Sequence, residues 1–183
     1  MKKAIFFDLL GTLGGEGIGD IRNFDFYPFA IDAIKLANDN GYLSIVITNQ
    51  SNIGRGNLTI NDFNIKISEL QMILKSKNTK LDDVLCCPHT NEDNCICKKP
   101  KTGLLKQASR KYDIDISESY VIGDMGKNDI VMGKNAGAKA ILVLTGVGNG
   151  SLEQYRSTWN AYNADYIAKN VLEAVEWIIS NHK

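Results

Sequence analysis

The chain has 183 residues, of which 44% are hydrophobic and 23% charged, as in an ordinary globular protein. Lysine and arginine balance aspartate and glutamate, so the formal net charge is zero. A neutral chain lacks the basic surface of a general nucleic-acid binder, and no apolar run approaches the ~20 residues of a membrane helix. We expect one domain over residues 1–183 that binds neither nucleic acid nor membranes and is a monomer or weak dimer.

Short apolar runs alternate along the chain with longer segments of helical periodicity. Pro28 suits the first turn of a helix, Thr59 is a candidate N-cap, and Gly41 is a candidate helix terminator. The alternation predicts an α/β fold, a parallel sheet with helices on both faces. In chain order we predict strand 4–7, helix 28–41, strand 43–48, helix 59–77, strand 81–86, helix 102–112, strand 120–122, helix 129–136, strands 140–144 and 166–168, and helix 171–179.

Polar residues follow four of these strands, where ligands of parallel sheets bind. They are Asp8, the run Thr48-Asn49-Gln50-Ser51, the pair Lys98-Lys99 in the loop after the third strand, and Gly123-Asp124. Two carboxylates from different strands, Asp8 and Asp124, can hold Mg²⁺, and a lysine and a threonine nearby could bind phosphate oxygens. A carboxylate can also attack phosphorus and form an aspartyl-phosphate. The pattern therefore favours phosphate chemistry in one crevice.

Nucleotide-binding loops fit the sequence poorly. Residues 14–19 are rich in glycine, but they do not form the G-x-G-x-x-G pattern that leads into a helix. The P-loop pattern G-x-x-x-x-G-K-[ST] does not occur in the sequence. We interpret residues 14–19 as a flexible loop beside the site.

All four cysteines and one of the two histidines fall within residues 86–97. The spacing Cys87-x-His89, five residues, then Cys95-x-Cys97 can close a tetrahedral and structural Zn²⁺ site. Two disulfides are disfavoured because Cys86 and Cys87 are adjacent and nothing marks the chain as secreted. A chance cluster of buried cysteines is the remaining alternative. We predict a zinc loop over 86–98, with Cys86 ending a buried strand, in a reduced, cytoplasmic protein.

The ordered motifs resemble those of the haloacid dehalogenase (HAD) superfamily of phosphohydrolases over nearly the whole chain. Residues 8–13 resemble its first motif, D-x-D-G-T-L; Thr48-Asn49-Gln50-Ser51 resembles the second, Lys99-Pro100 the third and residues 123–129 the fourth. The zinc loop before Lys99 is similar to that of heptose bisphosphate phosphatases and histidinol-phosphate phosphatases. The resemblance implies a Rossmann-like HAD fold. There is little room for a cap domain, because segment 14–27 is short and the segment after the second motif is filled by one helix and the zinc loop.

The resemblance also implies roles for individual residues. Asp8 would be the nucleophile and a Mg²⁺ ligand, Thr48 would bind the transferring phosphoryl group, and Lys99 would neutralise charge. Asp124 would complete the Mg²⁺ site, with Asp129 ordering its surroundings. The residues expected to face the substrate are Asn49, Gln50, Ser51 and Lys98, which stands where these families commonly have arginine. Zn²⁺, held by Cys87, His89, Cys95 and Cys97, would only position the two lysines.

Leu10 departs from the family pattern. It occupies the position of the family's second aspartate in the first motif. In the family, that aspartate protonates the leaving oxygen and then activates water. Its backbone carbonyl can still bind Mg²⁺, but its side chain cannot transfer a proton. Because a positioned acid–base is worth ~10²–10⁴-fold in rate, we expect a slow enzyme or a trapped phospho-enzyme.

Three hypotheses follow for the function. The first is a Mg²⁺-dependent phosphatase of small phosphorylated metabolites, with a heptose bisphosphate favoured and histidinol phosphate as the rival substrate. The second, suggested by Leu10, is a catalytically silent domain that binds a phosphorylated metabolite. The third, a zinc-dependent nucleic-acid binder, is disfavoured by the neutral charge.

Overall fold

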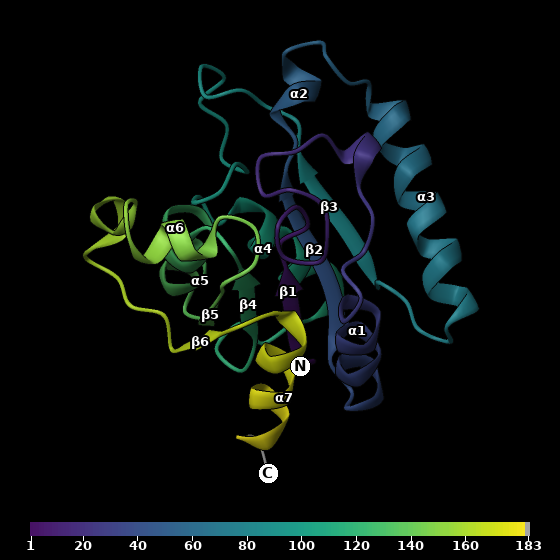
Figure 1. Cartoon of the computed structure of the whole chain (residues 1–183), viewed down its shortest axis with the longest axis vertical. Coiled ribbons are helices and arrows are strands. Elements are labelled where there is room, and N and C mark those ends of the chain that lie inside the picture. Colours follow the sequence, from purple (N-terminus) through teal and green to yellow (C-terminus); the bar gives the residue numbers. More distant parts are fainter. Residues whose placement is uncertain (182–183) are drawn as a thin grey trace.

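The computed structural model describes residues 1–181 and contains one sheet of six parallel strands in the order β3-β2-β1-β4-β5-β6 (Figure 1). The chain moves outward from β1 to β3 and then returns to add β4 on the other side of β1, so β1 lies where the direction reverses. Such a reversal opens a crevice at the carboxyl ends of the strands. The strands are β1 (Ala4–Phe7), β2 (Leu43–Asn49), β3 (Asp83–Cys87), β4 (Tyr120–Gly123), β5 (Lys139–Val143) and β6 (Tyr166–Ala168).

Helices cover both faces of the sheet, as predicted. On one face α1 (Ala30–Asp39), α3 (Ile60–Ser76) and α7 (Val171–Ser180) bury their apolar sides against the strands. On the other face lie α4 (Gly103–Tyr112) and α5 (Val131–Ala136). Side chains of β1 alternate between the two cores, with Ile5 and Phe7 on the first face and Ala4 and Phe6 on the second. Burial on both faces explains why this strand is apolar throughout.

The elements that the sequence did not indicate are short and lie mostly beside the carboxyl ends of the strands. The helix predicted at 129–136 begins at Val131, because a π-helical turn, η2, precedes it. The strand predicted at 81–86 extends one residue further, so Cys87 rather than Cys86 is its last residue. The remaining short elements are η1 (Ile21–Asn23), α2 (Ser51–Gly54), η2 (Gly126–Ile130), α6 (Gly148–Leu152) and η3 (Arg156–Trp159).

Local signals explain the better-predicted boundaries. Thr59 caps α3, because its Oγ accepts a hydrogen bond from the Asp62 amide at 3.0 Å while the Asp62 carboxylate accepts one from the Thr59 amide at 3.2 Å. Helix α1 starts two residues after Pro28, at Ala30. Its predicted terminator, Gly41, has a φ of +80°, a conformation that favours glycine.

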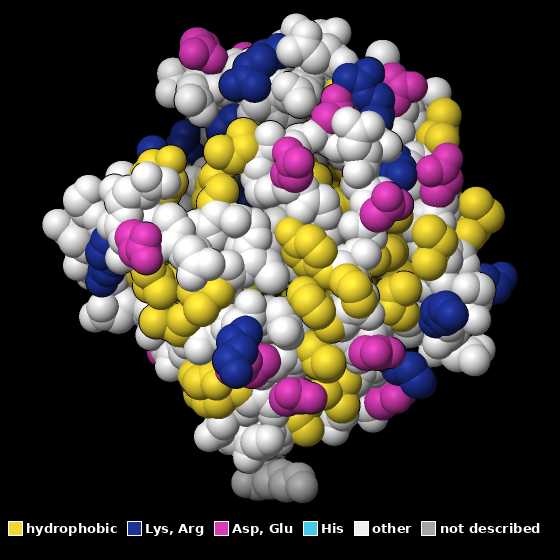
Figure 2. Space-filling view, viewed as in Figure 1, with side chains coloured by type: hydrophobic (Ala, Val, Ile, Leu, Met, Phe, Trp, Pro, Cys, Tyr) yellow, Lys and Arg dark blue, Asp and Glu magenta, His cyan; other side chains and the backbone are white. Residues whose placement is uncertain are grey.

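The segments most relevant to function lie at the end of the sheet to which the strands point. In Figure 1, α2 and the loop after β3 stand at that end, opposite the N-terminus and α7. Figure 2 shows acidic and basic side chains interspersed over the face in view, without a continuous field of one sign. Among the described residues, no helix combines the length and apolar character needed to cross a bilayer.

Candidate functional site

The carboxyl ends of β1, β2 and β4 and the loop after β3 surround one cavity of about 360 Å³. This arrangement confirms that the predicted strand ends converge. The predicted site residues that line the cavity are Asp8, Leu10, Thr48, Asn49, Gln50, Ser51, Lys98, Lys99, Asp124 and Asp129.

Lys99 joins two carboxylates at the centre of this cavity. Its ammonium lies 2.5 Å from Asp8 Oδ1 and 2.7 Å from Asp129 Oδ1, and its side chain is only 3% exposed. Burial alone would lower the pKa of Lys99, but the negative charges of Asp129 and Asp8 outweigh it and raise that pKa. Lys99 is therefore a permanent cation at neutral pH.

Asp124 is almost completely buried beside Asp8. Burial raises its pKa to about 8, and the charges of Asp8 and Asp129 contribute to the same shift. Its Oδ2 accepts a hydrogen bond from the Val147 amide at 2.8 Å. The backbone approaches the same carboxylate closely, because a Cβ added at Gly11 or Gly146 would come within 2.2 Å or 2.1 Å of Oδ2. Only glycine fits at these two positions.

Asp129 lies with Asp8 and Asp124, and one carboxylate oxygen from each of the three falls within 4.8 Å of the others. Its Oδ1 receives the Lys99 ammonium, and its Oδ2 accepts a hydrogen bond from the Met125 amide at 3.0 Å. Burial raises the pKa of Asp129 to about 6, against the lowering effect of Lys99. Both oxygens are thus already engaged, which suits a residue that orders its neighbours.

Residues at the carboxyl end of β2 line the cavity and also hold neighbouring groups in place. Asn49 fixes the backbone of Lys99, accepting from its amide at 3.0 Å and donating to its carbonyl at 3.3 Å. Gln50 is buried and donates from Nε2 to the Thr48 hydroxyl at 3.0 Å. The sequence predicted that both would contact substrate, and the structure adds that each positions a neighbouring side chain.

Leu10 is among the residues that line the cavity. It also packs against the main core, with its Cδ2 only 3.1 Å from where a Cβ on Gly15 would lie. Nearby, the Thr12 hydroxyl lies 3.3 Å from Asp8 Oδ2 and donates to it. The loop at 14–19 lies beside the site, as predicted, since Gly17, Ile18 and Gly19 line the cavity.

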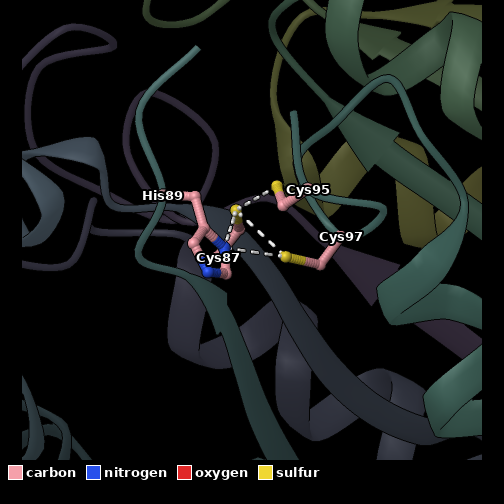
Figure 3. A group of neighbouring side chains, drawn as sticks. All are labelled: Cys87, His89, Cys95 and Cys97. Carbon is pink, nitrogen blue, oxygen red and sulfur yellow. Dashed lines mark hydrogen bonds between the residues drawn. The ribbon is translucent and has the colours of Figure 1, made fainter. Parts of the chain in front are cut away.

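The four predicted zinc ligands meet in one cluster, with their side chains directed at a common centre (Figure 3). Cys87 Sγ lies 3.6 Å from Cys95 Sγ and 3.3 Å from Cys97 Sγ, and His89 Nδ1 lies 3.2 Å from Cys97 Sγ. A tetrahedron with Zn–S bonds of about 2.3 Å has edges of about 3.8 Å, so these separations fit a Zn²⁺ ion. The half-buried Cys86 does not belong to this cluster.

Lys98 connects the predicted zinc loop, residues 86–98, to α2. Its ammonium donates to the Ser51 hydroxyl and, at 3.0 Å, to the His89 carbonyl, and the Ser51 hydroxyl also donates to that carbonyl at 2.9 Å. A metal that fixes His89 would therefore also fix the position of Lys98.

Sequence reasoning missed several residues that line the cavity. Arg55, one residue beyond α2, adds a second cation near Lys98. Its only signal was that it follows the second motif by four residues. The other residues without a sequence-based prediction are Asn52, Met125 and Asn128.

The donors present fit the two ions that the sequence implied. The carboxylates of Asp8, Asp124 and Asp129, which follow β1 and β4 or lie in η2, are the hard oxygen ligands that Mg²⁺ prefers. Three thiols and an imidazole are a typical donor set for structural zinc.

Comparisons with known proteins agree with this geometry. A HAD-hydrolase-like family model matches residues 96–174. The chain is 32% identical over 180 residues to D-glycero-beta-D-manno-heptose-1,7-bisphosphate 7-phosphatase from Helicobacter pylori, covering 97% of both chains. It is 36% identical to the protein of the same name from Pasteurella multocida, over 80% of this chain and 84% of that one.

Two further similarities are informative. The histidine biosynthesis bifunctional protein HisB of Buchnera aphidicola is 36% identical over 139 residues, which are 73% of this chain and 39% of that protein. The crystal structure of D,D-heptose 1,7-bisphosphate phosphatase from B. bronchiseptica, complexed with magnesium and phosphate, superposes with a TM-score of 0.88. It covers 98% of this chain and 99% of that one at 23% identity, and so bears out the fold.

We expect the purified protein to contain one zinc ion per chain. Cys97→Ser should abolish zinc retention because it removes one of four clustered donors, whereas Cys86→Ser should retain it. Metal analysis of both variants after dialysis against a chelator provides the measurement. Equal zinc loss from both would contradict the ligand set.

The raised pKa of Asp124 predicts a pH-dependent stability without magnesium. The folded protein retains a proton between the usual value of 3.8 and about 8, whereas the unfolded chain releases it, so the free energy of unfolding falls as pH rises through this range. Between about 6 and 8, where Asp129 has already titrated, Asp124→Asn should remove most of this slope. Urea unfolding in EDTA checks it, and an unchanged slope in Asp124→Asn would refute the assignment.

Proposed function

The chain belongs to the HAD-like phosphatases, which are phosphoric monoester hydrolases, and from that premise we propose that it is a Mg²⁺-dependent phosphatase of a heptose bisphosphate. The observation that carries this proposal is the contact of Lys99 with Asp8 beside the buried Asp124. It supports the proposal because Asp8, the nucleophile we propose, lies in one cavity with a buried cation and with Asp124, the further metal ligand we propose.

The roles of the residues follow from their positions. Asp8 Oδ2 attacks phosphorus while Oδ1 stays paired with Lys99, and the bond between phosphorus and the sugar oxygen breaks. Thr48, whose hydroxyl is held by Gln50, binds a phosphoryl oxygen, and Lys99 balances the developing negative charge. Asp8, Asp124 and the Leu10 carbonyl would hold Mg²⁺, which supplies electrostatic stabilisation of the phosphoryl oxygens when bound.

The proposed site lacks a side chain at position 10 that could transfer protons. The leaving sugar oxygen needs a proton, and the water that later cleaves the aspartyl-phosphate must lose one. The Leu10 side chain can do neither. Solvent must therefore supply the proton to the sugar oxygen and accept the proton from the attacking water. The expected result is slow turnover with phosphorylated Asp8 accumulating.

Two further cations favour a substrate with a second phosphate. Lys98 and Arg55 line the same cavity as Asp8 and Lys99, and neither forms an ion pair with Asp8. A bisphosphate would place one phosphate at Asp8 and the other near these cations, whereas histidinol phosphate offers no second phosphate. The relatives named as heptose bisphosphatases support this choice, and the likeness to HisB keeps histidinol phosphate as the alternative.

Phosphate release from D-glycero-D-manno-heptose 1,7-bisphosphate and from histidinol phosphate, with Mg²⁺, tests the substrate. We expect a higher kcat/KM for the bisphosphate and a complete loss of activity in Asp8→Asn, which removes the nucleophile. The reverse preference would assign the chain to histidinol phosphate. Tight binding of the bisphosphate with no phosphate release over hours would instead support a silent binding domain.

Leu10→Asp should raise turnover by about 10²–10⁴-fold, because it restores a positioned acid–base. Leu10 is half-buried at the cavity wall, so a carboxylate there can remain hydrated. Leu10→Asn is the matched control, because an asparagine side chain has the shape of aspartate but transfers no proton. Similar gains in both variants, or a gain in neither, would show that proton transfer at this position does not limit the rate.

A further inference from the structure

Ser151, on the short helix α6, is a buried residue for which the sequence suggested no role. Its hydroxyl donates to the backbone carbonyl of Asp124 at 2.8 Å and accepts from the backbone amide of Gly126 at 3.2 Å. It thus binds the chain on both sides of Met125, where the backbone leaves β4 and enters the π-helical turn η2. The orientation of the Asp124 carboxylate depends on that backbone.

The same segment also contacts the carboxylate of Asp124. Val147, four residues before Ser151, donates its amide to Asp124 Oδ2, and its carbonyl accepts the amide of Ser151 at 2.8 Å. One turn of chain therefore fixes both the backbone and the side chain of Asp124.

Trp159 contacts both Ser151 and the loop that Ser151 binds. Its indole N–H donates to the Ser151 carbonyl at 2.9 Å, and its ring lies so close to Gly126 that a Cβ there would approach it to 2.2 Å. The guanidinium of Arg156 lies 4.0 Å from the ring centroid and donates to the Trp159 carbonyl at 2.9 Å. Arg156, Trp159 and Ser151 thus form a continuous chain of contacts that ends at the Asp124 loop.

We propose that Ser151 is a positioning residue that sets the Mg²⁺ affinity of the site by holding the Asp124 backbone, with Trp159 supporting it. This inference rests on the proposed role of Asp124 as a magnesium ligand. Ser151 does not touch the metal or the substrate. Its loss leaves a buried carbonyl and a buried amide without their partner, and the loop can recover those bonds only by moving Asp124.

The test compares Ser151→Ala with Ser119→Ala. Ser119 is equally buried and its hydroxyl bridges the same two kinds of group, accepting from the Ala4 amide at 3.0 Å and donating to the Asp115 carbonyl at 2.5 Å. It precedes β4 at the opposite end of the strand from Asp124. Both variants should lose stability in the metal-free state, and only Ser151→Ala should lose magnesium affinity.

The apparent Kd for Mg²⁺ comes from the rise in unfolding temperature as MgCl₂ is added. We expect about a tenfold higher Kd in Ser151→Ala, equivalent to about 1.4 kcal/mol, and no change in Ser119→Ala. In phosphate-release assays, Ser151→Ala should need more Mg²⁺ but regain the wild-type kcat at saturation. A positioning effect predicts this split, whereas general loosening of the fold does not.

Each other outcome is decisive. An unchanged Kd in Ser151→Ala, or equal rises in both variants, overturns the role of Ser151. Absence of Mg²⁺ binding to the wild type overturns the proposed function instead. If Ser151→Ala fails to fold, Trp159→Phe removes the indole donor to the Ser151 carbonyl together with part of the ring while keeping an aromatic side chain. An Mg²⁺ affinity equal to that of the wild type would then reject the inference.

Discussion

The buried ammonium of Lys99 is the group on which the site depends. Three carboxylates meet in a space with little access to water, where an unpaired charge is costly. Lys99 contacts two of them, and its backbone is held in turn by Asn49. One cation therefore joins groups from β2, from η2 and from the residue that follows β1. The position of each group depends on the others.

The sequence was sufficient to predict the sheet and its helices, and the residues that it named as candidates line one cavity. Strands buried on both faces read as apolar runs, and polar residues such as Asp8 and Asp124 stand out at their ends. Arg55, Ser151 and Trp159 were not predictable in the same way. They belong to or adjoin elements of four or five residues, whose conformation is set by tertiary contacts rather than by periodicity.

Charge placement and proton transfer are separable in this site. The charged groups are fixed by hydrogen bonds between distant parts of the chain, such as Val147 to Asp124 and Asn49 to Lys99. Leu10 takes no part in those bonds through its side chain, which packs on the core beside Gly15. A change of side chain at this one position would therefore leave the hydrogen bonds that hold the charged groups intact.

The close approach of Gly11 and Gly146 to Asp124 limits which substitutions these two positions can accept during evolution. At most surface positions a new side chain extends into solvent, so a substitution has little effect on the fold. At these two positions even a methyl group would collide with a carboxylate oxygen, so neither neutral change nor gradual replacement is open to them. A residue larger than glycine at either place would require the Asp124 carboxylate or the backbone beside it to move.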